Sequence, residues 1–391
     1  MKIITRYILG QVLFYFVATL LTFLGLGVAG VISKATITDG LPLYASARLT
    51  PYILPQVGMV ALPVSILMAV SLTFGKLAGS NELIALKAMG VSPWKLFYPT
   101  WIFALIVSIF AVWVNDVAYS WGYTKMSEAI VSGSEAMLLG KLAADGRFSD
   151  PDGNITITVS GVMPDGTLVQ PAFSGKAFPG DGSAEFGRLT VLHEQEAPVI
   201  RIQMTNGIYK NAKGLGLFPQ PLTFDLPLDY FGVSVDEGDP SLAQIPNVVR
   251  AIKAEKESAC RKLAAEVIFS LAAGDPQVAG SSRWVELRDL EYQLDRRIIR
   301  CELGRPRRFS SGFSCFFFAW VGIPVAIWLN RSEPFICFFA CFLPILLTYY
   351  PLFMAGLNGA KEGTLPAAAC WGGNVFLGIV GYIILRRIHR Y

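Results

Sequence analysis

Residues 49–75 read LTPYILPQVGMVALPVSILMAVSLTFG and contain no Asp, Glu, Lys or Arg. A helix of about 20 mostly apolar residues is long enough to cross the hydrocarbon core of a bilayer. Five more stretches lack these charged residues over a comparable length: 7–33, 96–115, 309–330, 334–360 and 363–385. Because unpaired backbone groups are costly in lipid, all six are expected to be helices, with their internal prolines tolerated as kinks.

The composition agrees with a membrane protein. The chain has 391 residues, of which 53% are hydrophobic and 16% charged, whereas soluble domains carry about 25% charged residues. One such apolar stretch could be a buried helix of a soluble protein, but six of spanning length exclude that class. The first stretch exceeds the apolar core of a signal peptide, so it is interpreted as a retained anchor.

Basic residues indicate the orientation. With the amino terminus in the cytoplasm, the short cytoplasmic segments hold nine basic residues, and the short loops on the other side hold three. This positive-inside bias predicts cytoplasmic termini and an external middle segment. The middle segment is slightly acidic, so nucleic acid is not an expected partner.

The chain divides into three parts: spans one to three in residues 1–118, an inserted domain in 119–308, and spans four to six in 309–391. Within the insert, residues 146–235 alternate polar and apolar positions, and Asp-Gly or Asn-Gly pairs at 145, 152, 165, 181 and 206 predict turns between antiparallel strands. Several short strands at this spacing suggest a sandwich, a jellyroll-like domain or an open barrel. The domain is either a docking module or a curved sheet that receives a lipid chain. Residues 246–303 read as two helices, and Gly304 and Pro306 are expected to end the second before the fourth span.

The cytoplasmic loop between spans two and three, residues 81–90, predicts a short helix. Asn81 suits an N-cap, Glu82 the positive end of the helix dipole, and Gly90 a C-terminal stop. Ser92 and Pro93 are expected to begin the next helix. The helix is either a docking element for a soluble partner or a surface helix that only closes the loop.

Signatures of enzyme chemistry are missing from the sequence. There is no P-loop, no HExxH and no GxSxG motif, and only two histidines. No catalytic residue, metal ligand or cofactor is therefore expected. Ion-driven transporters usually keep charges inside their spans; these spans have none, so the energy is expected to come from a separate ATPase. A disulfide between Cys260 and Cys301 is left open.

The chain resembles the LptF/LptG permease family over its whole length. The spans and the strand-rich insert match its 3+3 arrangement, and six short motifs carry the likeness: Arg6-Tyr7-Ile8, Leu62-Pro63, Asn81-Glu82-Leu83, Ala88-Met89-Gly90-Val91-Ser92, Arg307-Arg308-Phe309-Ser310 and Gly322-Ile323-Pro324.

The resemblance implies a permease subunit of an ATP-driven transporter in the inner membrane of didermic bacteria. Such a subunit pairs with a second LptF/LptG-type permease and a cytosolic LptB-like ATPase dimer, often with an LptC-like periplasmic partner. The pair opens laterally, extracts lipopolysaccharide or a related glycolipid and passes it to a periplasmic bridge. Alternatives are a permease or scaffold of another envelope ABC system, and a membrane enzyme acting through carboxylates of the insert.

The resemblance also implies site residues. The ATPase-coupling set is Glu82, Leu83, Ala85, Ala88, Met89 and Gly90, and the lipid-binding set is Lys34, Arg307 and Arg308. The arginines would pair with lipid phosphates, whereas Arg296 and Arg297 are interpreted as ordinary helix-surface charges. One feature departs from the family pattern: an acidic residue is expected a few positions before Arg307, where Gly304 stands. Neither LptF nor LptG is favoured over the other.

Overall fold

The computed structural model describes residues 2–37, 49–90, 92–122, 125, 135, 138–149, 155–163, 165–175, 181–193, 198–211, 214–218, 222–227, 239–272, 282–329 and 334–390. The chain forms two compact units. The helical unit comprises residues 1–27, 54–120 and 239–391, and the strand unit comprises residues 28–53 and 121–238.

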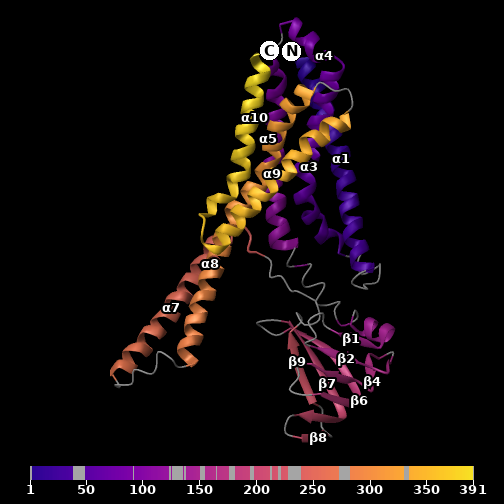
Figure 1. The fold of residues 1–391 in the computed structure, drawn as a ribbon, viewed down its shortest axis with the longest axis vertical. Helices are drawn as coiled ribbons and strands as arrows, with labels where there is room; N and C mark the ends of the chain where they lie inside the picture. Colours follow the sequence, from indigo (N-terminus) through magenta and orange to yellow (C-terminus); the bar gives the residue numbers. More distant parts are fainter. Residues whose placement is uncertain are drawn as a thin grey trace. The chain divides into compact units, whose positions relative to one another are not determined.

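Six described helices are long and apolar enough to span a membrane, as predicted. They are α1 (Lys2–Ile37), α3 (Thr50–Gly79), α5 (Pro93–Val117), α8 (Ser282–Leu329), α9 (Pro334–Glu362) and α10 (Gly372–Arg390). Three precede the β-strands in sequence and three follow them, which confirms the 3+3 order. The short helix α4 (Glu82–Ala88) lies at the end of the helical unit that also holds both chain termini (Figure 1).

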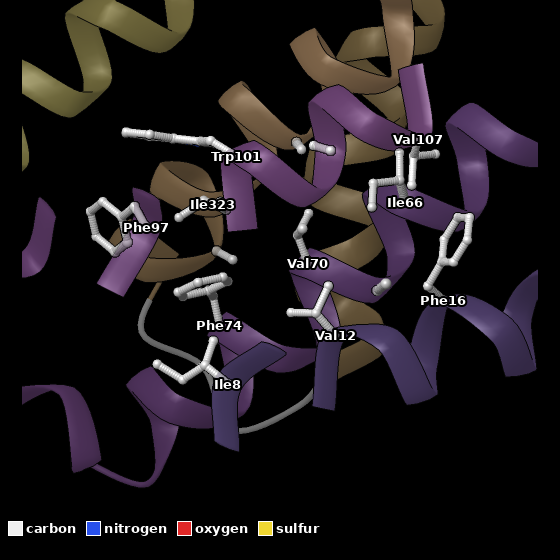
Figure 2. Packing of buried hydrophobic residues seen from close by; sticks show 14 of the residues in the cluster. Ile8, Val12, Phe16, Ile66, Val70, Phe74, Phe97, Trp101, Val107 and Ile323 are labelled. Carbon is white, nitrogen blue, oxygen red and sulfur yellow. The ribbon is translucent and has the colours of Figure 1, made fainter. Parts of the chain in front are cut away.

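An apolar cluster ties that end together. It joins Ile8 of α1, Phe74 of α3, Leu83 of α4, Phe97 of α5 and Leu385 of α10, each at most 5% exposed. Figure 2 shows several of these side chains packed among ones from α8. Side-chain packing of this kind supplies most of the association energy between helices in lipid.

The predicted helix end at Gly304 and Pro306 is wrong, because α8 runs unbroken through both residues. A proline inside a helix removes one hydrogen bond, but a packed neighbour can hold the helix together. Gly304 is instead a point of close approach: a Cβ there would lie 3.4 Å from Cδ1 of Ile245 at the start of α7. The fourth span and the last predicted helix of the insert therefore form one continuous helix of 48 residues.

The outer part of α8 pairs with α7 (Ile245–Ala272) as a helical hairpin, at the opposite end of the helical unit from α4 (Figure 1). Its core is Ile252, Ala259, Leu294 and Ile298. An ion pair between Lys256 and Asp295, at 2.6 Å, crosses the hairpin. The hydrogen bond from Lys256 to Asp295 raises the pKa of the lysine, so the lysine stays charged throughout the neutral range.

The strand unit holds an antiparallel sheet of nine described strands. They are β1 (Arg147–Ser149), β2 (Thr156–Thr158), β3 (Gly161–Val162), β4 (Thr167–Val169), β5 (Ala172–Ser174), β6 (Asp181–His193), β7 (Pro198–Asn211), β8 (Gly214–Phe218) and β9 (Leu222–Pro227). The path is β1-β2-β5-β6-β4-β3, and β7 pairs with β6, β8 and β9. One face is apolar and buried, with Ile157, Phe173, Ile200 and Ile202 at most 2% exposed. Leu138 and Leu142, from the helical residues 138–145, pack onto it.

Two of the predicted turns are wrong. Asp181-Gly182 opens β6, and Asn206-Gly207 lies inside β7, where the pairing with β6 passes from Ala184–Gly207 to Phe186–Thr205 and skips Glu185 and Asn206. Asn206 has a φ of 53°, and asparagine tolerates this left-handed region, so the pair is accommodated inside β7 without a change of register. The pair at 165 does turn between β3 and β4, whereas the pair at 152 lies outside the described residues.

The structure leaves Cys260 and Cys301 unbridged. Cys260 faces Glu291, and ten residues separate Glu291 from Cys301 along α8, which is about 15 Å of helix. We therefore expect the mass of the intact protein to be the same with and without reductant. Burial raises the pKa of the Cys260 thiol, so maleimide labelling of this cysteine should be slow at neutral pH and faster above it. A loss of two hydrogens per chain in the unreduced protein would contradict this.

Candidate functional site

The local sequence explains the geometry of α4. Asn81 precedes the helix, but its φ of 59° is left-handed, whereas an N-cap is usually extended. Its carbonyl accepts the Ala85 N–H at 3.0 Å, and the Ser80 hydroxyl donates to the Glu82 carboxylate at 3.0 Å. Gly90 has a φ of 77°, the left-handed stop predicted for it. Ser92 and Pro93 begin α5 as predicted, although the Ser92 hydroxyl makes no capping hydrogen bond.

The two faces of α4 differ in polarity and burial. Leu83 is 5% exposed and Leu86 packs beside it on the apolar cluster. The opposite face exposes Ala85, Ala88 and Met89, and Met89 is 69% exposed. Of the six coupling residues, Leu83 thus holds the helix in place and the other five lie at least partly exposed. Sequence reasoning missed Ile84, which is 57% exposed on the same surface.

A second cluster of polar groups lies at the opposite end of the helical unit. Arg308 of α8 donates through Nη1 to the carboxylate of Asp116 near the end of α5. Arg307 donates to the carboxylate of Asp239, in the segment that leads into α7. The Tyr119 ring lies beneath the guanidinium of Arg307, with its centroid 4.0 Å from Cζ. We call Asp116, Asp239, Arg307 and Arg308 the outer charge cluster.

Burial distinguishes the two arginines. The Arg308 side chain is 0% exposed and the Arg307 side chain 15% exposed. Within the described residues, Nε of each arginine and Nη2 of Arg308 have no hydrogen-bond acceptor. The two carboxylates offset both positive charges and so reduce the free-energy cost of burying the two guanidinium groups. Both arginines thus bind carboxylates that lie far from them in the sequence, on α5 and in the segment before α7.

The remaining predicted residue, Lys34, lies exposed near the end of α1. Arg296, interpreted as a helix-surface charge, is exposed, and its guanidinium donates to the Tyr292 hydroxyl and, at 2.9 Å, to the carbonyl of Lys361. This places Arg296 at the C-terminal end of α9, where a cation stabilises the last carbonyls. Arg297 and Arg300 are exposed.

A buried polar contact joins the spans below this cluster. The Ser310 hydroxyl donates to the Cys370 carbonyl at 2.7 Å, and the Asn374 amide donates to the Ser310 carbonyl at 2.9 Å. It links α8 to α10, and no pattern in the sequence predicts it. Among the described residues, no group of three His, Cys, Asp or Glu side chains could hold a metal ion.

The fold and these two polar ends define a polytopic membrane subunit of the permease class. The family model of the lipopolysaccharide export system permease LptF/LptG matches residues 6–174 and 283–387. The match covers more than half of the chain, which therefore belongs to the LptF/LptG family. No curated protein matches the chain significantly.

Membership of this family makes the chain a multi-pass inner-membrane permease of lipopolysaccharide export, a transport subunit and not an enzyme. The matched ranges omit residues 175–282, which contain β6 to β9 and α7.

Proposed function

We propose that this chain is one permease subunit of an ATP-driven transporter that extracts lipopolysaccharide, or a related glycolipid, from the inner membrane. A cytosolic LptB-like ATPase dimer docks on α4, and a second LptF/LptG-type subunit completes the pathway. The lipid passes through the strand domain toward a periplasmic bridge, with an LptC-like protein as a further partner. The observation that carries the proposal is the exposed face of α4, held on the apolar cluster by a buried Leu83.

The ends of the helical unit support the proposed orientation. Both termini and α4 lie at one end (Figure 1). At the other end, Asp116 of α5 binds Arg308, and Asp239, before α7, binds the neighbouring Arg307. Arg6, Lys76, Lys95, Arg386 and Arg387 lie toward the α4 end. By the positive-inside rule this end is cytoplasmic, so the strand domain is periplasmic.

Two helices offer a surface for the second subunit. In the most apolar 18 residues of each helix, only 11% of α1 and 28% of α9 are buried, compared with 72% of α3. Phe14 and Leu21 on α1, and Phe339 and Leu347 on α9, are all more than half exposed, at 68%, 65%, 52% and 71%. These faces meet lipid or the partner permease, and a lateral opening between two subunits exposes them in turn.

The lipid-binding set divides according to burial. Lys34 is exposed, and the Arg307 side chain keeps 15% of its surface exposed, so both are placed to bind a lipid phosphate. Arg308 is fully buried against Asp116. It reaches a head group only if α5 and α8 separate, so its role in the proposal is to hold these helices.

Charge reversal at Glu82 tests the ATPase docking. We expect Glu82→Arg to lower the amount of soluble ATPase that co-purifies in mild detergent by about tenfold or more. The reason is that two like charges placed opposite each other in an interface cost several kcal/mol of binding free energy. The matched control is Glu257→Arg, a reversal at an exposed position of α7. Undiminished co-purification with Glu82→Arg would count against the proposal.

Photocrosslinking tests the substrate. A photoreactive residue at position 34 is expected to form an adduct with lipopolysaccharide in membranes, whereas the same residue at position 257, on α7, is expected to form none. An adduct with other envelope lipids alone would favour a permease or scaffold of a different ABC system.

A further inference from the structure

Helices α5 and α8 are in contact from Trp101 to Asp116 of α5. Near the α4 end, the rings of Trp101 and Trp320 lie 4.6 Å apart between centroids. Farther along, a Cβ on Gly312 would lie only 2.4 Å from Cγ2 of Val112, so the backbones approach closely. At the outer end, Asp116 meets Arg308. These three contacts follow in antiparallel order, so the two helices form one continuous seam.

The outer end of this seam also holds the start of α7. The Asp116 carboxylate accepts the backbone N–H of Leu242 at 2.9 Å, in addition to the Arg308 guanidinium. Arg307 binds Asp239 three residues earlier in the same segment. One carboxylate therefore joins α5, α8 and the segment leading into α7.

The other end of α5 follows directly on α4. Pro93 is the first residue of α5, and Leu83 of α4 shares the apolar cluster with Leu96 and Phe97 of α5. A displacement of α4 thus moves the near end of α5. On α8, no break separates Arg308 from the hairpin, and the 26 residues from Ser282 to Arg307 extend about 39 Å as a helix.

We infer that the outer charge cluster is a latch that makes α5, α8 and the start of α7 a single rigid strut, through which movement of α4 reaches the outer hairpin. Its physical basis is the burial of Arg308. Pulling α5 away from α8 leaves a guanidinium and a carboxylate unpaired in a medium of low dielectric, which is costly. Asp116 and Arg308 are positioning residues in this view. Only the lipid-release readout below rests on the proposed function.

The test uses the full-length protein and a pair of substitutions. Asp116→Leu/Arg308→Met removes both buried charges, so no unpaired ion remains to unfold the protein, and replacing such a pair by apolar residues is often neutral for stability. The matched control is Lys253→Met/Glu302→Leu, which removes an exposed ion pair, 2.8 Å long, between α7 and α8.

The first readout is hydrogen exchange measured by mass spectrometry. We expect the double variant to melt as the wild type does, but to exchange the amides of residues 240–249 at least about tenfold faster, because these amides open locally once Asp116 no longer holds the segment. The α4 peptide should exchange at the wild-type rate, and the control pair should leave both peptides unchanged. Unchanged exchange at 240–249 would overturn the latch, as would faster exchange throughout the protein.

The second readout is coupling in the complex with the co-purified ATPase. The double variant should hydrolyse ATP within about twofold of wild type while lipid release falls by about tenfold, a split that a loss of stability alone would not produce. Locally faster exchange with unimpaired lipid release would overturn the transmission of movement. If the wild-type complex releases no lipid, the proposed function fails, and hydrogen exchange alone decides the latch.

Discussion

Replacing Gly312 with leucine should abolish the folded helical unit. The Cβ of any side chain at this position lies 2.4 Å from Cγ2 of Val112, 2.7 Å from its backbone nitrogen and 2.9 Å from its Cα. Overpacking costs about 1–3 kcal/mol where side chains can shift. Here the obstacle is the main chain of α5, so α5 and α8 must move apart, and we expect a cost of at least about 3 kcal/mol.

The measurement is thermal unfolding in detergent, together with the yield of monodisperse protein. Gly25→Leu is the matched control, because nothing lies within 4 Å of a Cβ at that position on α1. The control should purify and unfold as the wild type does. Equal behaviour of the two variants would mean that α5 and α8 are not in close backbone contact.

Replacing Phe173 with alanine should destabilise the strand unit by about 3–5 kcal/mol, the usual cost of deleting a buried aromatic ring. Phe173 is 2% exposed and its ring centroid lies 5.2 Å from that of Phe224. Its ring also covers Gly182, where a Cβ would lie 2.5 Å from Cζ. Removing the ring therefore opens a cavity between β5, β6 and β9 that the short strands cannot readily fill.

Hydrogen exchange of the β6 and β7 amides measures this effect in the intact protein. Each loss of about 1.4 kcal/mol in the free energy of unfolding raises the population of the open state tenfold. The protected amides should therefore exchange about 100-fold faster or more. Phe186→Ala, at a 37% exposed position of β6, is the control and should change the rates by less than about tenfold. Similar exchange rates in the two variants would mean that the face of the sheet with Phe173 is not the core face.

The apolar face of the sheet bears on the two roles that the sequence left open for the insert. Ile200, Ile202 and Met204 are each 0% exposed and pack with Leu138 and Leu142. In the described residues this face is thus covered by the chain's own side chains. In the proposed function, acyl chains that enter the strand domain would therefore have to displace part of this packing.

Much of the architecture follows from the sequence alone. Six charge-free stretches specify six spanning helices because a charged residue or an unpaired backbone group in lipid is costly, and that constraint acts locally. The alternation around Ile155, Ile157 and Val159 likewise specifies a half-buried strand. Gly90 and Pro93 set the ends of the helices on either side of them, because their backbone preferences also act within a few residues.

Only the tertiary structure decides the partners of Arg307 and Arg308. Asp116 lies 192 positions from Arg308 in the sequence, and Asp239 lies 68 positions from Arg307, so no local pattern relates them. The same holds for Gly304 and Pro306, which would end an isolated helix but lie within α8 because α7 packs against it. Backbone preferences and hydropathy act over a few residues, whereas burial of a charge depends on which segments the fold brings together.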